Sequence, residues 1–491
     1  MLLICAVWIL SIPHINAQMP IKLNIRPQVD PDTADLMHYG KPRFWQATAM
    51  VAGSNIALWG YDRFIQRGDY AYISLHSIKE NFKHGFIWDN DHMGTNMFLH
   101  PYNGSLFFNA ARSNGFNYWK SGLFALGGSA MWELFMEREY PSTNDIIATP
   151  IGGMAIGEVC YRMSDIVLDD RATGSERGLR EAAAFVISPM RGLTRIINGD
   201  AWRHRSTTGR QFGIPPIGVE ISSGFRILSF KNRHAGTSKS GFTMELNMEY
   251  GDRFEGTSRQ PYDYFTFRSV LNIINTQPVL SQLNIKGRLL SRELLETRDQ
   301  FLSVGMYQHF DFYDSDTISE HVGKCPYKLG VPASAGVGVM FRDIERRGWV
   351  FDAYAHANGV FLGAILSDHY QVDERNYNLA SGFSLKGGAH LVFDHDRFSA
   401  SISHEYYRLF TWKGYKRGTN LRTVDYHTLN VQGDKSSAAF GVTELRVDLK
   451  LWRKLYISLG ISHYYRSTRY RDFPDVKSSA ISESVILTYK L

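Results

Sequence analysis

The chain has 491 residues, of which 44% are hydrophobic, 13% aromatic and 21% charged. This length predicts at least two structural units, and the composition excludes collagen-like, coiled-coil and largely disordered chains. The 54 basic and 48 acidic residues leave a formal charge of +6, which argues against a nucleic-acid-binding protein. Beyond the N-terminus there is no apolar run of about 18 residues, which excludes a helical multi-span membrane protein but not a transmembrane β-barrel.

The N-terminus is expected to be a secretory signal peptide over residues 1–17. An apolar stretch runs from Leu2 to Ile12, and Ala17 supplies the small residue of a cleavage point. No lysine or arginine precedes this stretch, which departs from the usual pattern. The alternative is a buried N-terminal strand or helix.

Residues 18–205 are predicted to form a helical domain. Apolar residues recur at helical spacing in three segments, Phe44–Gln66, Trp119–Glu139 and Asp145–Val167. Charges interrupt each segment, so none is expected to span a bilayer. Gly152, Gly153 and Gly157 lie inside the last segment, and glycines inside helices indicate close packing between helices.

Five short segments of this domain are distinctive: Trp88-Asp89-Asn90-Asp91-His92, His100-Pro101-Tyr102-Asn103-Gly104, Ala111-Arg112-Ser113-Asn114-Gly115, Pro141-Ser142-Thr143-Asn144-Asp145 and Thr149-Pro150-Ile151-Gly152-Gly153. Together they resemble the domain-of-unknown-function family 3943, which consists of uncharacterised bacterial envelope proteins found notably among Bacteroidetes. The resemblance covers roughly Trp88 to Arg203. It implies an envelope protein, but no activity, substrate or catalytic residue.

The same region carries the candidate site residues. The candidate catalytic residues are His100, Glu133, Glu137 and Asp145. Glu133 and Glu137 are four residues apart, so on a helix they share one face, and an ionised carboxylate in an apolar helix is costly unless it is paired or used. A histidine facing two carboxylates can hold a divalent ion or activate water. The candidate binding residues are Asp89, Asp91, His92, Asn103, Arg112 and Asn144.

Each of these residues also has a structural interpretation. Asp145 stands three residues after Ser142, the spacing of a capping box at a helix start. His100 precedes Pro101, as at an ordinary helix entry. The two glutamates have basic candidates as ion-pair partners, namely Arg112, Lys120 and Arg138. No cofactor is identified, because no nucleotide-binding or common hydrolase motif is present.

A basic stretch follows the acidic pair Asp169 and Asp170. It contains Arg177, Arg180, Glu181, Arg191 and Arg195. These residues can contact anionic lipid head groups, or they can form a solvated helix face with ion pairs along it.

Residues 206–491 are predicted to form an antiparallel β-barrel of about 12 strands. Apolar and polar residues alternate over long stretches, for example from Phe242 to Tyr250 and from Glu444 to Leu451. A soluble β-sandwich gives the same alternation, but strands of 9 to 12 residues and aromatic residues at the strand ends favour an outer-membrane barrel.

Connection lengths support the barrel. Short turns are expected at 394–396 and 452–454, and long polar loops at Arg408–Thr423 and Tyr465–Ser479. Short turns at one end and long loops at the other are typical of outer-membrane barrels.

The fold class is therefore expected to be α+β, with an N-terminal helical bundle and a C-terminal barrel. The protein is predicted to lie in the bacterial outer membrane as a scaffold, pore or ligand-binding protein. The alternative is an envelope enzyme that hydrolyses or modifies lipid or lipopolysaccharide through His100, Glu133 and Asp145. Expected partners are outer-membrane lipid or lipopolysaccharide and the barrel-assembly machinery, but no nucleic acid.

Overall fold

The computed structural model describes residues 41–232, 235–273, 278–315, 326–345, 348–394, 396–425 and 428–491. The predicted signal peptide, residues 1–17, lies outside the described residues. The chain divides into two units, which are described separately. The helical unit extends to Asp89 and resumes over Leu99–Pro216, and the barrel unit comprises Asn90–Phe98 and Ile217–Leu491.

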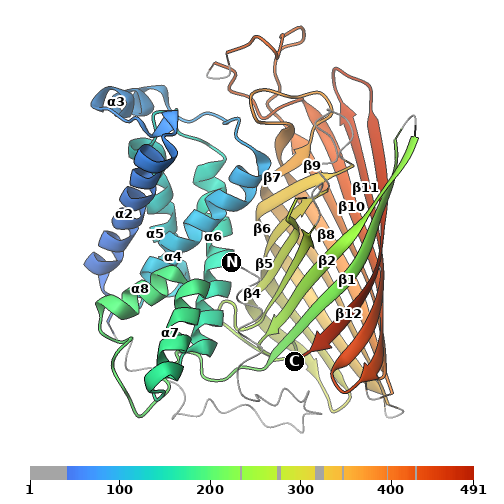
Figure 1. The fold of residues 1–491 in the computed structure, drawn as a ribbon. Helices are drawn as coiled ribbons and strands as arrows, with labels where there is room; N and C mark the ends of the chain where they lie inside the picture. Colours follow the sequence, from blue (N-terminus) through green and yellow to red (C-terminus); the bar gives the residue numbers. More distant parts are fainter. Residues whose placement is uncertain are drawn as a thin grey trace. The chain divides into compact units, whose positions relative to one another are not determined.

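The helices belong mainly to the helical unit (Figure 1). The α-helices are α2 (Phe44–Tyr61), α3 (Leu75–His84), α4 (His100–Arg112), α5 (Tyr118–Met131), α6 (Asp145–Val167), α7 (Gly174–Ile187) and α8 (Pro189–Ile197). Shorter turns are the π-helical η1 (Asp62–Gln66), η3 (Thr95–Leu99) and η4 (Trp132–Met136) and the 3₁₀-helical η2 (Asp69–Ala71). None of the described helices is both long and apolar enough to cross a membrane.

Local sequence explains where several helices begin. The hydroxyl of Ser74 accepts a hydrogen bond from the amide of Ser77, and the hydroxyl of Ser77 accepts one from the amide of Ser74, which completes a capping box for α3. The side chain of Asn117 caps α5 in the same way by accepting from the amide of Lys120. Pro101 occupies the first turn of α4, where the missing amide proton costs nothing.

Helices α4, α5 and α6 pack on one another, and α2 packs against α4 and α5. Gly153 of α6 meets the backbone of Gly104 on α4, and Gly157 meets the ring of Phe108. A side chain at either glycine would enter space that the neighbouring helix fills. The predicted close packing of the glycine-rich helix is confirmed.

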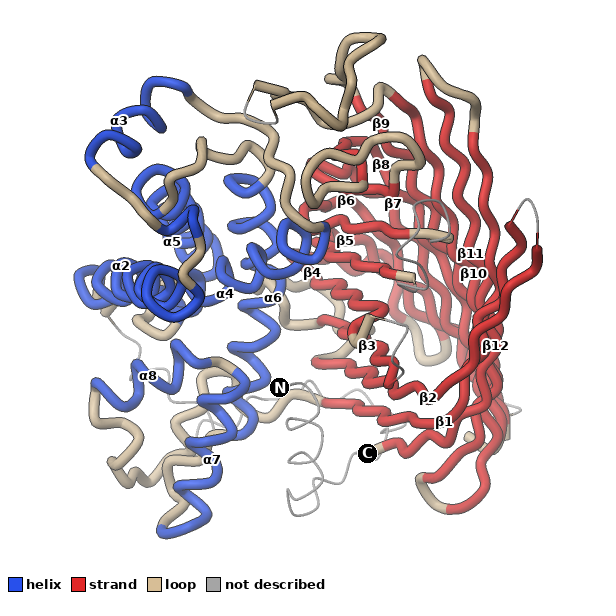
Figure 2. The backbone as a smooth tube through the Cα atoms, turned by 45° about the horizontal axis from the view of Figure 1, so that its top comes forward, coloured by secondary structure: helices blue, strands red, loops and turns tan. Residues whose placement is uncertain are grey.

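The barrel unit contains twelve described strands, shown in Figure 2. They are β1 (Ile217–Asn232), β2 (Ala235–Tyr250), β3 (Phe265–Ile273), β4 (Leu280–Glu296), β5 (Gln300–Asp314), β6 (Lys328–Glu345), β7 (Trp349–Leu366), β8 (Tyr377–Phe393), β9 (Phe398–Thr411), β10 (Ser436–Trp452), β11 (Leu455–Tyr470) and β12 (Val476–Lys490).

Each strand pairs antiparallel with its neighbours in sequence, and β1 pairs with β12 to close the barrel. Closure leaves no sheet edge with unpaired backbone groups, which is the requirement for strands in a bilayer. The predicted α+β fold, with helices followed by an antiparallel barrel of outer-membrane type, is confirmed. The alternative of a soluble sandwich is wrong, because one closed sheet replaces two open ones.

The connections follow the prediction in part. Strand β10 ends at Trp452 and β11 begins at Leu455, so the predicted short turn is confirmed. The long loop predicted at Tyr465–Ser479 is wrong, because Tyr465 pairs directly with Ser479 inside the β11–β12 hairpin. Polar residues in this segment alternate with other residues along two paired strands, and a polar segment of this kind resembles a loop in sequence.

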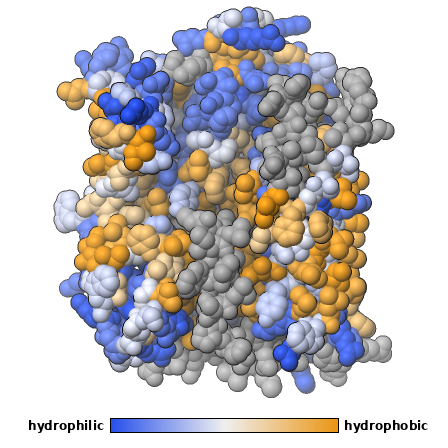
Figure 3. Space-filling view, viewed as in Figure 1, coloured by the Kyte–Doolittle hydropathy of each residue, from blue (hydrophilic) through white to orange (hydrophobic). Residues whose placement is uncertain are grey.

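The outer surface of the barrel is apolar. On β10, the side chains of Leu445 and Leu449 are exposed. The charged residues next to them in sequence, Glu444, Arg446 and Asp448, form ion pairs in the barrel interior. Side chains of successive strand residues point to opposite faces, so the apolar set faces outward. Apolar side chains accordingly gather over the barrel strands on the right of Figure 3.

Candidate functional site

Three of the predicted site residues converge in the helical unit. His100 opens α4, Glu133 lies in the π-helical turn η4, and Asp145 opens α6. One potential ligand atom from each side chain lies within 4.8 Å of the other two. Both carboxylates are almost fully buried, with 2% of Glu133 and 1% of Asp145 exposed. We call this group the His–Glu–Asp cluster.

Backbone bonds around Ser142 hold the two carboxylates. The amide of Ser142 donates to Oε2 of Glu133 at 2.6 Å, and its hydroxyl accepts from the amide of Asp145 at 3.2 Å. In a full capping box the amide of Ser142 would donate to Asp145 instead. Only half of the predicted box therefore forms, and the carboxylate of Asp145 stays directed into the cluster.

A buried amide brings a third carboxylate beside the cluster. The side-chain nitrogen of Asn144 donates to Oδ1 of Asp89 at 3.0 Å and to Oδ1 of Asp145 at 3.1 Å. Burial, with the negative charges of Asp89 and Glu133, raises the pKa of Asp145 well above its usual range. Burial also lowers the pKa of His100, although Asp89 opposes this shift, so the neutral imidazole is favoured.

Glu137 does not join the cluster, so the shared helix face predicted for Glu133 and Glu137 is wrong. Helix α5 widens into the π-helical turn η4 and ends at Met136, which leaves Glu137 in extended backbone. Its carboxylate accepts a hydrogen bond from the indole nitrogen of Trp132. The four-residue spacing places two side chains on one face only while the regular helix continues.

The other candidate binding residues lie apart from the cluster. In the barrel unit, the carbonyl of Asp91 accepts from the hydroxyl of Tyr377 at 2.9 Å, and the exposed His92 pairs with Glu374 at 3.0 Å. In the helical unit, Asn103 is half-buried on α4. The guanidinium of Arg112 forms a bidentate pair with Glu158 at 2.8 and 2.9 Å.

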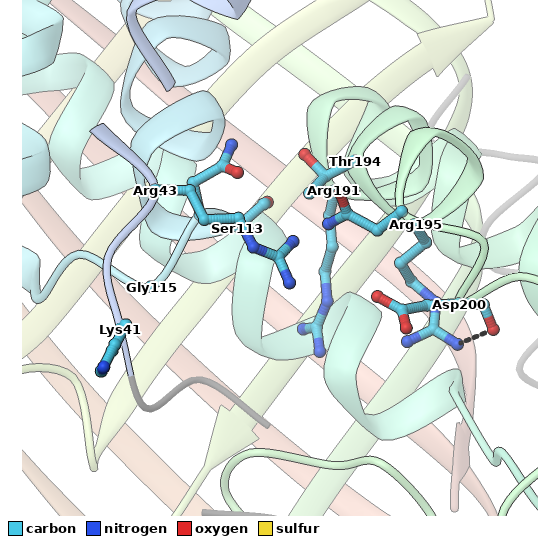
Figure 4. A pocket seen from close by; sticks show the side chains of 10 residues that line it. Lys41, Arg43, Ser113, Gly115, Arg191, Thr194, Arg195 and Asp200 are labelled. Atoms are coloured by element: carbon cyan, nitrogen blue, oxygen red, sulfur yellow. Dashed lines mark hydrogen bonds between the residues drawn. The ribbon is translucent and has the colours of Figure 1, made fainter. Parts of the chain in front are cut away.

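Most of the basic stretch forms a buried ion-pair network, whereas Arg180 pairs along α7 with the exposed Glu176. Arg177 and Arg195 both pair with Asp170, at 3.0 and 2.6 Å, and Arg191 pairs with Asp165. Arg191 and Arg195 line the small pocket in Figure 4, whose volume is about 20 Å³. That volume holds one water molecule, and both guanidinium groups already have partners, so we exclude this pocket as a ligand site.

The barrel lumen contains a second group of charged residues that the sequence did not single out. Arg268 on β3 pairs with Glu444 on β10, and Arg446 on β10 pairs with Glu245 on β2 at 3.3 Å. Strands β3 and β10 are not neighbours, so the Arg268–Glu444 pair crosses the lumen. Their alternation marks these residues as inward-facing, but only the closed barrel determines which of them meet.

An aromatic layer lies next to these ion pairs. It consists of Tyr313, Tyr327, Tyr407, Phe440 and Tyr464, all buried, which belong to one hydrophobic cluster. The rings of Tyr327 and Tyr464 stack at 4.2 Å, and the rings of Tyr313 and Phe440 are 5.7 Å apart. Four of these residues lie on β5, β9, β10 and β11, and Tyr327 directly precedes β6, so the buried aromatic layer joins strands that are not all neighbours and occupies part of the barrel interior.

Beside the aromatic layer, the lumen contains a partly open polar cavity of about 150 Å³. Its lining includes three basic side chains, Arg268, Lys286 and Lys386, and three acidic ones, Asp311, Glu405 and Glu444. Arg268 pairs with Glu444, and Lys386 pairs with Asp311 at 2.5 Å and Glu405 at 3.5 Å. Within the described residues no carboxylate pairs with Lys286, whose ammonium instead lies 4.3 Å from the ring centre of Tyr354.

Comparisons with known proteins agree with the sequence resemblance. The family model described as Domain of unknown function (DUF3943) matches residues 85–190, a span that contains the His–Glu–Asp cluster. The comparison with curated protein sequences found no match.

Several solved structures are similar to part of the chain. The NanC porin is 9% identical, with a TM-score of 0.25, over 56% of this chain and 100% of its own. The toluene transporter TodX of Pseudomonas putida is 8% identical, with a TM-score of 0.23, over 56% of this chain and 89% of its own. An outer membrane channel from Pseudomonas putida F1 is 8% identical, with a TM-score of 0.28, over 56% of this chain and 95% of its own. These scores are too low to carry an argument, so the fold rests on the strand pairing.

Proposed function

We propose that this chain, whose residues 85–190 match the model of a domain family of unknown function, is an outer-membrane β-barrel protein that binds a small anionic solute in its lumen. The closed sheet and its apolar outer face support the membrane location. A barrel in water would expose charged residues outward, whereas here they pair in the interior.

The filled lumen favours a binding protein over an open diffusion pore. A water-filled porin channel needs an unobstructed polar passage. In this barrel an ion pair between Arg268 and Glu444 crosses the lumen, and the aromatic layer fills an adjoining section. A solute therefore meets a partly open cavity, whose volume of about 150 Å³ is roughly that of a cavity that accommodates benzene.

The observation that carries the proposal is the ammonium group of Lys286. The other two basic side chains of the cavity lining, Arg268 and Lys386, are paired with its three acidic ones. Lys286 faces the cavity with only an aromatic ring as its described partner. A charge in such a site is costly unless it gains a partner, and a carboxylate on a bound solute would supply one.

Replacing Lys286 with Met is expected to weaken binding of a small carboxylate by roughly 10- to 100-fold, because a hydrogen bond to a charged group is lost. The measurement is calorimetric titration of the detergent-solubilised protein with benzoate, and with benzamide as a neutral analogue. Wild-type protein is expected to prefer benzoate, and the variant is expected to lose that preference.

Lys477→Met is the matched control, because Lys477 is exposed on β12 and does not line the cavity. It is expected to bind benzoate as the wild type does. The proposal is contradicted if wild-type protein binds neither compound, or if Lys286→Met retains full preference for benzoate.

A further inference from the structure

We propose that the His–Glu–Asp cluster is a binding site for a divalent transition-metal ion, held by His100, Glu133 and Asp145. This site lies in the helical unit and is independent of the proposed luminal function. Its ligands would be one imidazole nitrogen and one oxygen from each carboxylate.

The distance between His100 and Asp145 fits a shared ion better than a direct hydrogen bond. Nε2 of His100 and Oδ1 of Asp145 are 3.9 Å apart, which is too far for a hydrogen bond. Metal–ligand bonds of about 2.0–2.2 Å separate two ligand atoms on one ion by roughly 3–4 Å. The three side chains come from three separate elements, yet their ligand atoms lie within 4.8 Å of one another, so small adjustments complete the geometry.

The charge distribution also favours a cation. Glu133 and Asp145 are buried beside each other, and Asn144 holds Asp89 close to Asp145 through two hydrogen bonds. Carboxylates at such short range repel one another in a medium of low polarity. No lysine or arginine of the described residues pairs with Asp145, so a bound divalent ion would offset this negative charge.

The ligand set indicates the class of metal. Carboxylates alone suit Mg²⁺ and Ca²⁺, whereas an imidazole nitrogen adds preference for Zn²⁺, Mn²⁺ or Fe²⁺. Three protein ligands leave at least one coordination position for water or another ligand, as in catalytic rather than structural zinc sites. Asn144 and the backbone amide of Ser142 hold the carboxylates in position, as second partners of metal ligands commonly do.

The test is metal binding by the purified full-length chain in detergent. The protein is stripped with a chelator, exposed to Zn²⁺ or Mn²⁺ with Mg²⁺ as a comparison, passed over a desalting column and analysed for metal content. Wild-type protein is expected to retain close to one equivalent of Zn²⁺ or Mn²⁺ and no Mg²⁺. His100→Ala and Glu133→Gln are each expected to weaken binding by more than about 100-fold.

Glu137→Gln and His92→Ala are the matched controls, because Glu137 bonds to Trp132 and His92 is an exposed histidine of the barrel unit. Both are expected to retain metal as the wild type does. Co²⁺ absorption of the wild-type protein gives an independent readout, since a tetrahedral site that includes nitrogen produces strong visible bands and these should vanish in His100→Ala.

The proposal is overturned if the stripped wild-type protein takes up neither ion, or if the controls lose metal together with the cluster variants. If His100→Ala fails to fold, the wild-type stoichiometry and the conservative Glu133→Gln variant still decide the outcome. Loss of benzoate binding in Lys286→Met does not bear on this result, because Lys286 is in the barrel unit.

Discussion

Replacing Glu158 with Ala is expected to destabilise the helical unit by about 3–5 kcal/mol, the usual cost of leaving buried charges without their partner. Glu158 is fully buried on α6 and accepts hydrogen bonds from Arg112 and from Arg162, the latter at 2.9 Å. Burial alone would raise the pKa of Glu158, but the two guanidinium groups outweigh burial and lower it. Removing the carboxylate leaves two buried cations facing each other.

The thermal midpoint of the helical signal in far-UV circular dichroism measures this effect. Glu176→Ala is the matched control, because Glu176 also pairs with an arginine, Arg180 at 2.9 Å, but its side chain is 61% exposed. Exposed pairs contribute under about 1 kcal/mol, so this control is expected to unfold almost as the wild type does. Equal midpoints for the two variants would contradict a structural role for the buried Glu158 pairs.

Replacing Gly104 with Ala is expected to destabilise the same unit by about 1–3 kcal/mol or more through overpacking. A Cβ atom at Gly104 would lie 1.8 Å from the carbonyl oxygen of Thr149 on α6. Because that contact is with backbone, helices α4 and α6 must separate to relieve it. The separation would also move His100, which opens α4, away from Asp145, which opens α6.

Gly127→Ala on α5 provides the opposite control. Nothing lies within 4 Å of a Cβ atom at Gly127, and the residue is exposed. Alanine there is expected to stabilise the helix by about 0.5–1 kcal/mol, because glycine loses more backbone entropy on folding. If urea unfolding finds Gly104→Ala as stable as Gly127→Ala, then the proposed close approach of α4 and α6 is incorrect.

The architecture of this protein could be predicted where one physical pattern dominates. Strict alternation of apolar and polar residues predicts strands such as β2 and β10, because each has one apolar face for lipid and one polar face for the lumen. Strands β6 and β7 are harder to predict from the sequence, since they are rich in alanine and glycine and register shifts interrupt their pairing. The strand count was predicted from average spacing alone.

The candidate sites could likewise be predicted only in part, because the sequence shows the chemistry of a residue but not its neighbours in the fold. His100, Glu133 and Asp145 were selected for their chemistry, and the fold brings them together. Glu137 was selected because a regular helix was assumed, and the π-helical turn removes it from that face. Lys286 was not selected at all. Its missing ion partner is a property of the closed barrel, in which residues far apart in sequence become neighbours.

Lipid contact of three consecutive residues on β8 tests the central claim, that the barrel spans a membrane with its apolar face outward. Phe383 and Leu385 are exposed, whereas Ser384 between them is fully buried. The native cysteines are replaced by serine, and a nitroxide label is attached at each of the three positions in turn. The collision rates of each label with oxygen and with a water-soluble relaxant are then measured in liposomes. High oxygen accessibility is predicted at 383 and 385 and low accessibility at 384. Exposure of the 383 and 385 labels to the water-soluble relaxant would contradict the account.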